Sequence, residues 1–147
     1  KDWEVYGNTV IGYDKGILVG GENQDVHDNI ITNCNNAIVL ADGKNNTIDD
    51  NTASSNVLGS VGITSSAVGI DQDNVVVTGG SIISVDEALD LDDVVGIGNG
   101  LIFDNVDFNK GVIIKDSDNI TIQNSSYVTE PVQINSTNIT LTDNTIE

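Results

Sequence analysis

The sequence predicts an all-β protein wound as one parallel β-solenoid, and three observations support this prediction. Asn, Asp, Gly, Ser and Thr dominate the composition, while Val and Ile supply most of the apolar mass. These residue types favour strands and tight turns over helices. A strand-like phrase recurs along the chain, and no stretch shows a helical pattern. The 147 residues suffice for one core, so 1–147 is expected to form a single domain.

Seven segments share a pattern in which two apolar residues flank a turn. They begin at intervals of 21, 22, 29, 26, 19 and 19 residues. A period near 20 residues is typical of a β-solenoid, in which stacked coils bury apolar faces that no coil can bury alone. The segments are VYGNTV (5–10), VHDNII (26–31), IDDNTA (48–53), VTGGSI (77–82), FDNVDF (103–108), IQNSSY (122–127) and LTDNTI (141–146).

A second short strand follows most copies of the pattern. Ile17, Ile38 and Leu89 each lie 12 residues after the first residue of their copy. Each coil is therefore expected to give one strand to each of two or three parallel sheets, in about seven coils. One inward column is predicted at Val5, Val26, Ile48, Val77, Phe103, Ile122 and Leu141, and a second at Ile17, Ile38, Leu89, Val112 and Val132.

The Asn of the recurring phrase has an architectural role in this scheme. Asn8, Asn29 and Asn51 fall at the same corner of three successive coils. A stacked Asn can adopt the left-handed conformation at a bend and pass side-chain hydrogen bonds along the column. These three residues are therefore predicted to form a structural ladder.

The Asn ladder, the Val and Ile columns and the coil length resemble the right-handed parallel β-helix of the pectin-lyase-like superfamily. The phrases DNITIQNSSYV (118–128) and TNITLTDNTIE (137–147) are especially similar to Asn-rich β-helix repeats of archaeal and bacterial surface proteins. The resemblance covers essentially the whole chain and implies the right-handed fold. It leaves the function open, because this superfamily includes lyases, hydrolases, epimerases, phage tailspikes and adhesin stalks.

The charge balance excludes several partners. The chain has 23 acidic residues and five basic ones, all Lys, for a net charge of −18. Nucleic acid and anionic membranes require a cationic face, so neither is an expected partner. No apolar run approaches the roughly 18–20 residues of a membrane-spanning helix, so no membrane insertion is expected. The one cysteine, Cys34, rules out a disulfide within the chain.

Alternation places one residue after each inward anchor on the outer face of the first sheet. Tyr6, His27 and Asp49 would then lie on three adjacent coils, about 5 Å apart. Such a row could act as acid and base on a polysaccharide. The alternative is an ordinary solvated strand face that carries the one histidine. The superfamily resemblance implies an Arg base for pectate lyases and a Gly-His-Gly motif for polygalacturonases, and this chain has neither.

Two segments, 54–74 and 84–100, break the regular spacing and are expected to form loops on one face, often the binding face. They are rich in carboxylates, which at such density suit Ca²⁺. A solvated acidic surface is the alternative. Candidate calcium ligands are Asp71, Asp73, Asp90, Asp92 and Asp93.

Five Asn-x-Ser/Thr triplets permit N-glycosylation on a surface protein. They begin at Asn45, Asn119, Asn124, Asn135 and Asn138.

The sequence favours a structural or adhesive module outside the cytoplasm. A cell-surface layer, appendage, filament or viral fibre is the expected setting, with glycans as possible contacts. No capping element is recognisable, so other copies of the chain or flanking parts of a longer one are expected to cover the ends. The alternatives are a polysaccharide lyase, epimerase or hydrolase that uses Tyr6, His27 and Asp49, and a calcium-stabilised carbohydrate-binding module. No cofactor is expected apart from Ca²⁺ in the last case.

Overall fold

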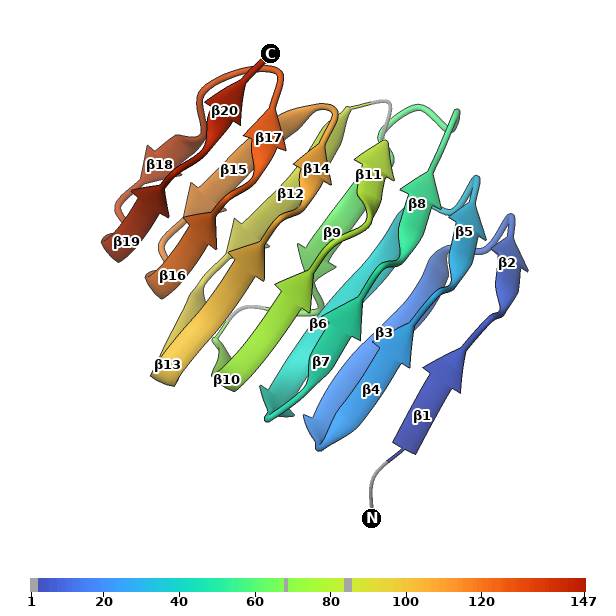
Figure 1. Cartoon of the computed structure of the whole chain (residues 1–147), viewed down its shortest axis with the longest axis horizontal. Coiled ribbons are helices and arrows are strands. Elements are labelled where there is room, and N and C mark those ends of the chain that lie inside the picture. Colours follow the sequence, from blue (N-terminus) through green and yellow to red (C-terminus); the bar gives the residue numbers. More distant parts are fainter. Residues whose placement is uncertain (1–2, 68, 84–85) are drawn as a thin grey trace.

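A computed structural model describes residues 3–67, 69–83 and 86–147 and winds them into a parallel β-solenoid (Figure 1). The fold class predicted from the repeat is confirmed, with about six turns rather than seven. All strand pairs are parallel, and each strand pairs with those of the coils before and after it. The right-handed sense of the coil remains a prediction from the family resemblance.

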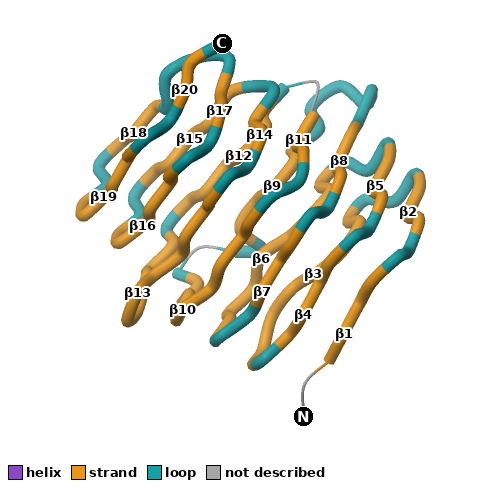
Figure 2. Tube along the Cα trace, in the orientation of Figure 1, coloured by secondary structure: helices purple, strands orange, loops and turns teal. Residues whose placement is uncertain are grey.

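The strands stack in three columns (Figure 2), which form one 13-stranded and one 7-stranded sheet. The β1 column contains β1 (Trp3–Tyr6), β4 (Gln24–His27), β7 (Thr47–Asp49), β10 (Ile70–Thr78), β13 (Val94–Asp104), β16 (Asp118–Gln123) and β19 (Thr137–Thr142). The β2 column contains β2 (Thr9–Ile11), β5 (Ile30–Thr32), β8 (Thr52–Ser54), β11 (Ser81–Ile83), β14 (Asp107–Phe108), β17 (Ser126–Tyr127) and β20 (Thr145–Ile146). The β3 column contains β3 (Lys15–Glu22), β6 (Asn36–Lys44), β9 (Val61–Ser65), β12 (Glu87–Asp92), β15 (Gly111–Lys115) and β18 (Val132–Ile134). The 7-stranded sheet is the β2 column, and the other two columns are joined in one sheet where β10 pairs with β6.

The predicted β1 column is confirmed in register from end to end, although Leu141 on the last coil is 37% exposed. Each anchor pairs with the anchor of the next coil, and Phe103 and Ile122 are fully buried. The last apolar residue of each repeat forms a matching inward column in the short strands, as Ile31 and Phe108 illustrate. Phe103 and Phe108 meet edge to face, with ring centroids 5.8 Å apart. The apolar side chains of the two columns thus share one core.

The second predicted column is correct for four residues and wrong for one. Ile17, Ile38, Leu89 and Val112 are all buried in the β3 column. Val132 instead pairs with Ile113 and is 51% exposed. A one-residue shift in register turns a side chain to the other face of a sheet, which explains the difference.

The two long segments were wrongly expected to be loops. Segment 54–74 contains β9 and the start of β10, and Ile63 of β9 is fully buried. Ile63 lies 15 residues after Ile48, because a longer turn precedes it, so the 12-residue spacing missed the strand. Segment 84–100 lies largely in β12 and β13. Its extra residues are accommodated at a register shift in β13, between Ile97 and Leu101, where Gly98 has positive φ.

Asn8, Asn29 and Asn51 stack at the corner between the β1 and β2 columns. The Asn29 Oδ1 accepts from the backbone N–H and side-chain amide of Asn8, at 3.0 and 3.1 Å. Asn51 repeats both contacts with Asn29, at 3.1 and 2.9 Å. The Asn51 amide also donates to the carbonyl groups of Val26 and Asp49. These bonds satisfy backbone groups that the turn removes from strand pairing.

The left-handed conformation was assigned to the wrong residue of this corner. The positive φ belongs to the residue before each Asn, with 64° at Gly7, 55° at Asp28 and 47° at Asp50. The Asn that follows is then turned inward, and Asn29 and Asn51 are buried. The ladder stops at Gly80, where any side chain would collide with the backbone oxygen of Asn51.

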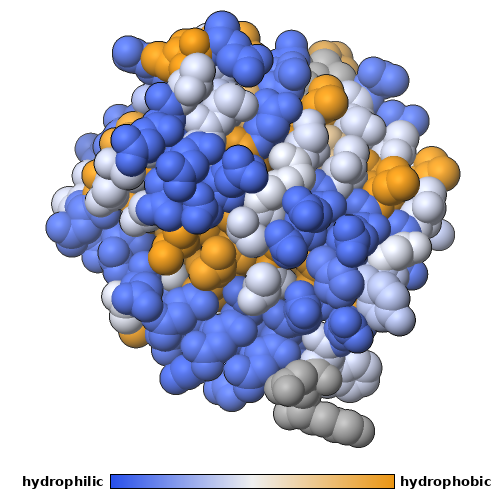
Figure 3. Space-filling view, in the orientation of Figure 1, coloured by the Kyte–Doolittle hydropathy of each residue, from blue (hydrophilic) through white to orange (hydrophobic). Residues whose placement is uncertain are grey.

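The face of the molecule shown in Figure 3 is largely hydrophilic, with apolar side chains between the polar ones. In the part of the chain that the structure describes, no helix has the length and apolar character needed to cross a membrane. The buried side chains lie inside the coils, so the open outer faces are the places to search for a site.

The substitution Asn51→Ala should destabilise the fold by about 2–4 kcal/mol. It removes the acceptor of two Asn29 groups and leaves the buried carbonyl of Val26 without its side-chain partner. Asn8→Ala is the matched control, because Asn8 is exposed and should cost about 1 kcal/mol or less. Urea denaturation of both variants measures the two costs. Equal losses would contradict the ladder's role.

Candidate metal site on the open face of the β1 column

The outer face of the first two coils carries four polar side chains in register. Because Val5 and Val26 point inward, the residues on either side of each point outward. Glu4 pairs with Asp25, and Tyr6 pairs with His27. Neighbouring strands lie about 4.8 Å apart, so each pair is in side-chain contact range.

Tyr6, His27 and Asp49 occupy adjacent strands, in the row that alternation indicates. The rings of Tyr6 and His27 are stacked, with centroids 5.2 Å apart and an interplanar angle of 4°. Burial, and next the nearby carboxylates of Asp50 and Asp28, raise the pKa of Asp49. The acid–base role of this row on a polysaccharide remains a prediction.

Two carboxylates bracket the imidazole of His27. Its Nδ1 lies 2.8 Å from Asp28 Oδ2, and its Nε2 lies 3.2 Å from Glu4 Oε1. The hydrogen bond with Asp28, followed by the one with Glu4, raises the pKa of His27 above 6.5. When the ring is neutral, a proton on Nδ1 is held by Asp28, which leaves the Nε2 lone pair facing Glu4.

Glu4, Asp25 and His27 form a potential metal-binding cluster. Each offers one ligand atom, and these atoms all lie within 4.8 Å of one another. Within residues 3–67, 69–83 and 86–147, this is the one group of three or more His, Cys, Asp or Glu side chains with that property. A cation between them would relieve the repulsion of Glu4 and Asp25, which are held side by side by strand pairing.

Asp28 has the position of an orienting partner. A metal-binding His usually donates its other ring N–H to a carboxylate, which fixes the tautomer and the ring. Here the Nδ1 contact to Asp28 and the stacked Tyr6 ring hold the imidazole from two directions. The left-handed φ of 55° at Asp28 starts the turn directly after the β4 strand, beside His27. The contacts with Asp28 and Tyr6 therefore hold the imidazole in one orientation.

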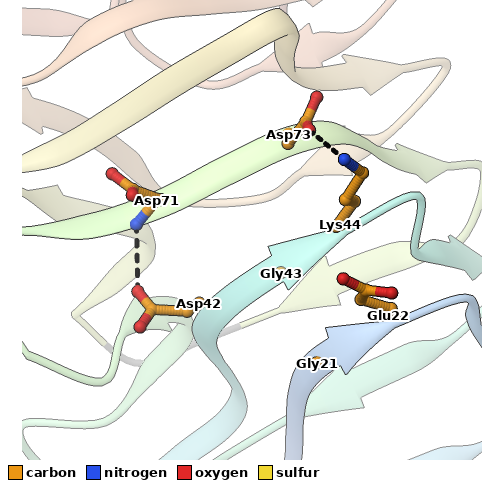
Figure 4. Close-up of a pocket in the computed structure, with 7 residues that line it drawn as sticks. All are labelled: Gly21, Glu22, Asp42, Gly43, Lys44, Asp71 and Asp73. Atoms are coloured by element: carbon orange, nitrogen blue, oxygen red, sulfur yellow. Dashed lines mark hydrogen bonds and ion pairs between the residues drawn. The ribbon is translucent and has the colours of Figure 1, made fainter.

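The five candidate calcium ligands do not converge in the same way. Asp71 and Asp73 lie on β10, whereas Asp90 and Asp92 lie on β12 of another column and Asp93 in the turn that follows. Two of them are engaged with lysines, Asp73 with Lys44 at 3.1 Å and Asp92 with Lys115 at 2.9 Å. The groove around Asp71 and Asp73 also contains Glu22 and Asp42 (Figure 4). Calcium binding there remains a prediction.

The five glycosylation candidates share a conformation that the sequence did not reveal. Each has the left-handed backbone conformation, with φ between 50° and 56°. Four donate their side-chain amides within the protein, as Asn124 does to Asp104 at 2.8 Å and Asn138 does to Asp118 at 2.8 Å. The asparagines are Asn45, Asn119, Asn124, Asn135 and Asn138; of these, Asn119 is half-buried and the others are exposed. Modification remains a prediction.

Comparison with known proteins identifies one family. Residues 1–94 match the family model described as NosD, periplasmic copper-binding protein. The matched part is more than half of the chain and contains Glu4, Asp25, His27 and Asp28. No curated protein and no solved structure matches the chain at a significant level.

The His27 pKa should be raised in solution. Its ion pairs with Asp28 and Glu4 stabilise the fold when His27 is protonated. This stabilisation is complete below the unfolded-state pKa of about 6.5 and is lost as pH rises through the folded-state value. An NMR pH titration of the imidazole measures the shift. Asp28→Gly should lower the pKa, whereas Asp50→Gly, at the same left-handed corner one coil further, should change it little. No difference between the variants would contradict the assignment to Asp28.

Proposed function

The chain belongs to the NosD family of periplasmic copper-binding proteins, and we propose that it is an extracytoplasmic β-solenoid module that binds copper on the open face of its first two coils. The solenoid would act as a stiff support on which the ligands are held by strand pairing. The convergence of Glu4, Asp25 and His27 is the observation that carries this proposal.

The donor atoms of the cluster fit this metal. Imidazole nitrogen and carboxylate oxygen are suitable ligands for copper in its divalent state. The cluster offers one imidazole and two carboxylates on an exposed sheet face, where a metal ion and one or more waters have access. In the neutral ring, a proton on Nδ1 would be held by Asp28, which would leave Nε2 unprotonated and able to bind the metal.

A second candidate is the structural or adhesive role expected from the repeat. It is supported by the regular columns and by large side chains that lie in the open, among them Tyr6, Tyr13 and Leu18. Tyr rings have an apolar body and a polar tip, so they suit contacts with glycans and with other protein copies. This role is compatible with copper binding, because Tyr13 and Leu18 lie outside the cluster of Glu4, Asp25 and His27. The acid–base role would instead compete with copper for His27.

Copper binding should depend on His27. The purified chain is titrated with Cu(II) by isothermal calorimetry, and electron paramagnetic resonance reports nitrogen ligation. His27→Ala should weaken binding about 100-fold, which corresponds to about 2.8 kcal/mol. Asp143→Asn is the control. Asp143 is exposed and occupies, in the last coil, the corner that Asp28 occupies in the second, so this change should leave copper binding unchanged. Equal affinities for native protein and His27→Ala would contradict the proposal, as would the absence of Cu(II) binding.

The structural role has a separate test. Multi-angle light scattering with electron microscopy should find filaments or rods whose mass is a multiple of 15.5 kDa. Self-association is expected to increase with salt, because screening weakens repulsion between chains of net charge −18. Particles of single-chain mass at every concentration and salt would rule out self-assembly.

A further inference from the structure

On the basis of the proposed function, we propose that the cluster of Glu4, Asp25 and His27 selects the oxidised ion, Cu(II), against Cu(I), with Asp28 as its positioning residue. The ligand types, the charge around them and the hydrogen bonds of the imidazole all favour the oxidised ion.

The chain lacks the ligands that Cu(I) prefers. Cu(I) is a soft ion that favours thiolate and thioether sulfur, as in Cys and Met. There is no Met in the sequence, and the one cysteine, Cys34, is 1% exposed. Its Sγ faces the carbonyl of Thr32, at 3.7 Å, in the turn after β5 rather than on the β1 column. No sulfur ligand of this chain can therefore join the cluster.

The charge at the cluster favours the ion with the higher charge. Glu4, Asp25 and Asp28 surround one imidazole, and the carboxylate of Asp49 lies in the adjacent row. The attraction of these carboxylates for a doubly charged ion is about twice that for a singly charged one. Among the described residues no lysine forms an ion pair with these acids, since Lys44 and Lys115 bind acids elsewhere.

The hydrogen bonds of the imidazole also favour Cu(II). Nδ1 lies 2.8 Å from Asp28, so a neutral ring that donates this hydrogen bond presents the lone pair of Nε2 on the side of Glu4, 3.2 Å away. The ring cannot turn freely, because Tyr6 stacks on it. Fixed nitrogen and oxygen donors on a flat face are well suited to the tetragonal coordination of Cu(II), which can add water in its open positions. Asp28 contributes orientation and acts through His27.

Selectivity is measured by two competition titrations of the native chain. Cu(II) is titrated against a chelator of known affinity, and Cu(I) is titrated under anaerobic conditions against bathocuproine disulfonate. The affinity for Cu(I) should be at least about 100-fold weaker. If the chain binds neither Cu(II) nor Cu(I), the proposed function is refuted. Tight Cu(II) binding with comparable Cu(I) binding would leave the proposed function intact and refute this inference.

The role of Asp28 is tested with variants that keep its backbone conformation. Gly and Asn both tolerate positive φ, so Asp28→Gly and Asp28→Asn should fold as the native chain does. Asp28→Gly should weaken Cu(II) binding about 10- to 100-fold and change its electron paramagnetic resonance spectrum. Asp28→Asn, which keeps an acceptor oxygen, should restore part of the affinity, and Asp50→Gly should behave as native. Unchanged affinity and spectrum in Asp28→Gly would refute the positioning role.

Discussion

The stacking of one coil on the next is the constraint on which the rest of the structure depends. Each strand pairs only with the strands above and below it, so every backbone position repeats along the solenoid at the strand spacing of about 4.8 Å. Inward columns such as that of Val26, Ile48 and Val77 fill the core because this register is maintained. The same register places the outward residues opposite one another, whatever their charge. The same strand register therefore produces both the core and the candidate site.

Much of the fold could be predicted, because inward residues and turns repeat together. The first inward column was predictable in full, since each anchor precedes a turn that only Asn, Asp, Gly or similar residues form well. Among the inward residues, the prediction failed at Ile63 and Val132. A longer turn moves Ile63 beyond the expected spacing, and a local change of register exposes Val132. Both depend on turn length and strand alignment, which periodicity does not determine.

The candidate site could be predicted only in part. Alternation after the anchor locates Tyr6, His27 and Asp49, but the repeat begins at the anchor and so omits the outward residues before it, Glu4 and Asp25. Extending the repeat by one residue would have found them. Asp28 was hidden for another reason. Asp28 lies at a corner that requires a residue with positive φ, and this requirement alone accounts for an Asp there. Its second role, the contact with His27, becomes visible only in the structure.

The open face also shows how a rigid scaffold can favour a ligand. In a flexible loop, Glu4 and Asp25 could separate, but pairing of β1 with β4 keeps their backbones about one strand spacing apart. When the His27 ring is protonated, its Nε2, 3.2 Å from Glu4, offsets part of the repulsion between the two carboxylates. A bound cation would replace that repulsion with attraction, and because unfolding separates the ligands, binding would also stabilise the fold. The strand pairing that stacks the core is thus also the property that would make this face a metal site.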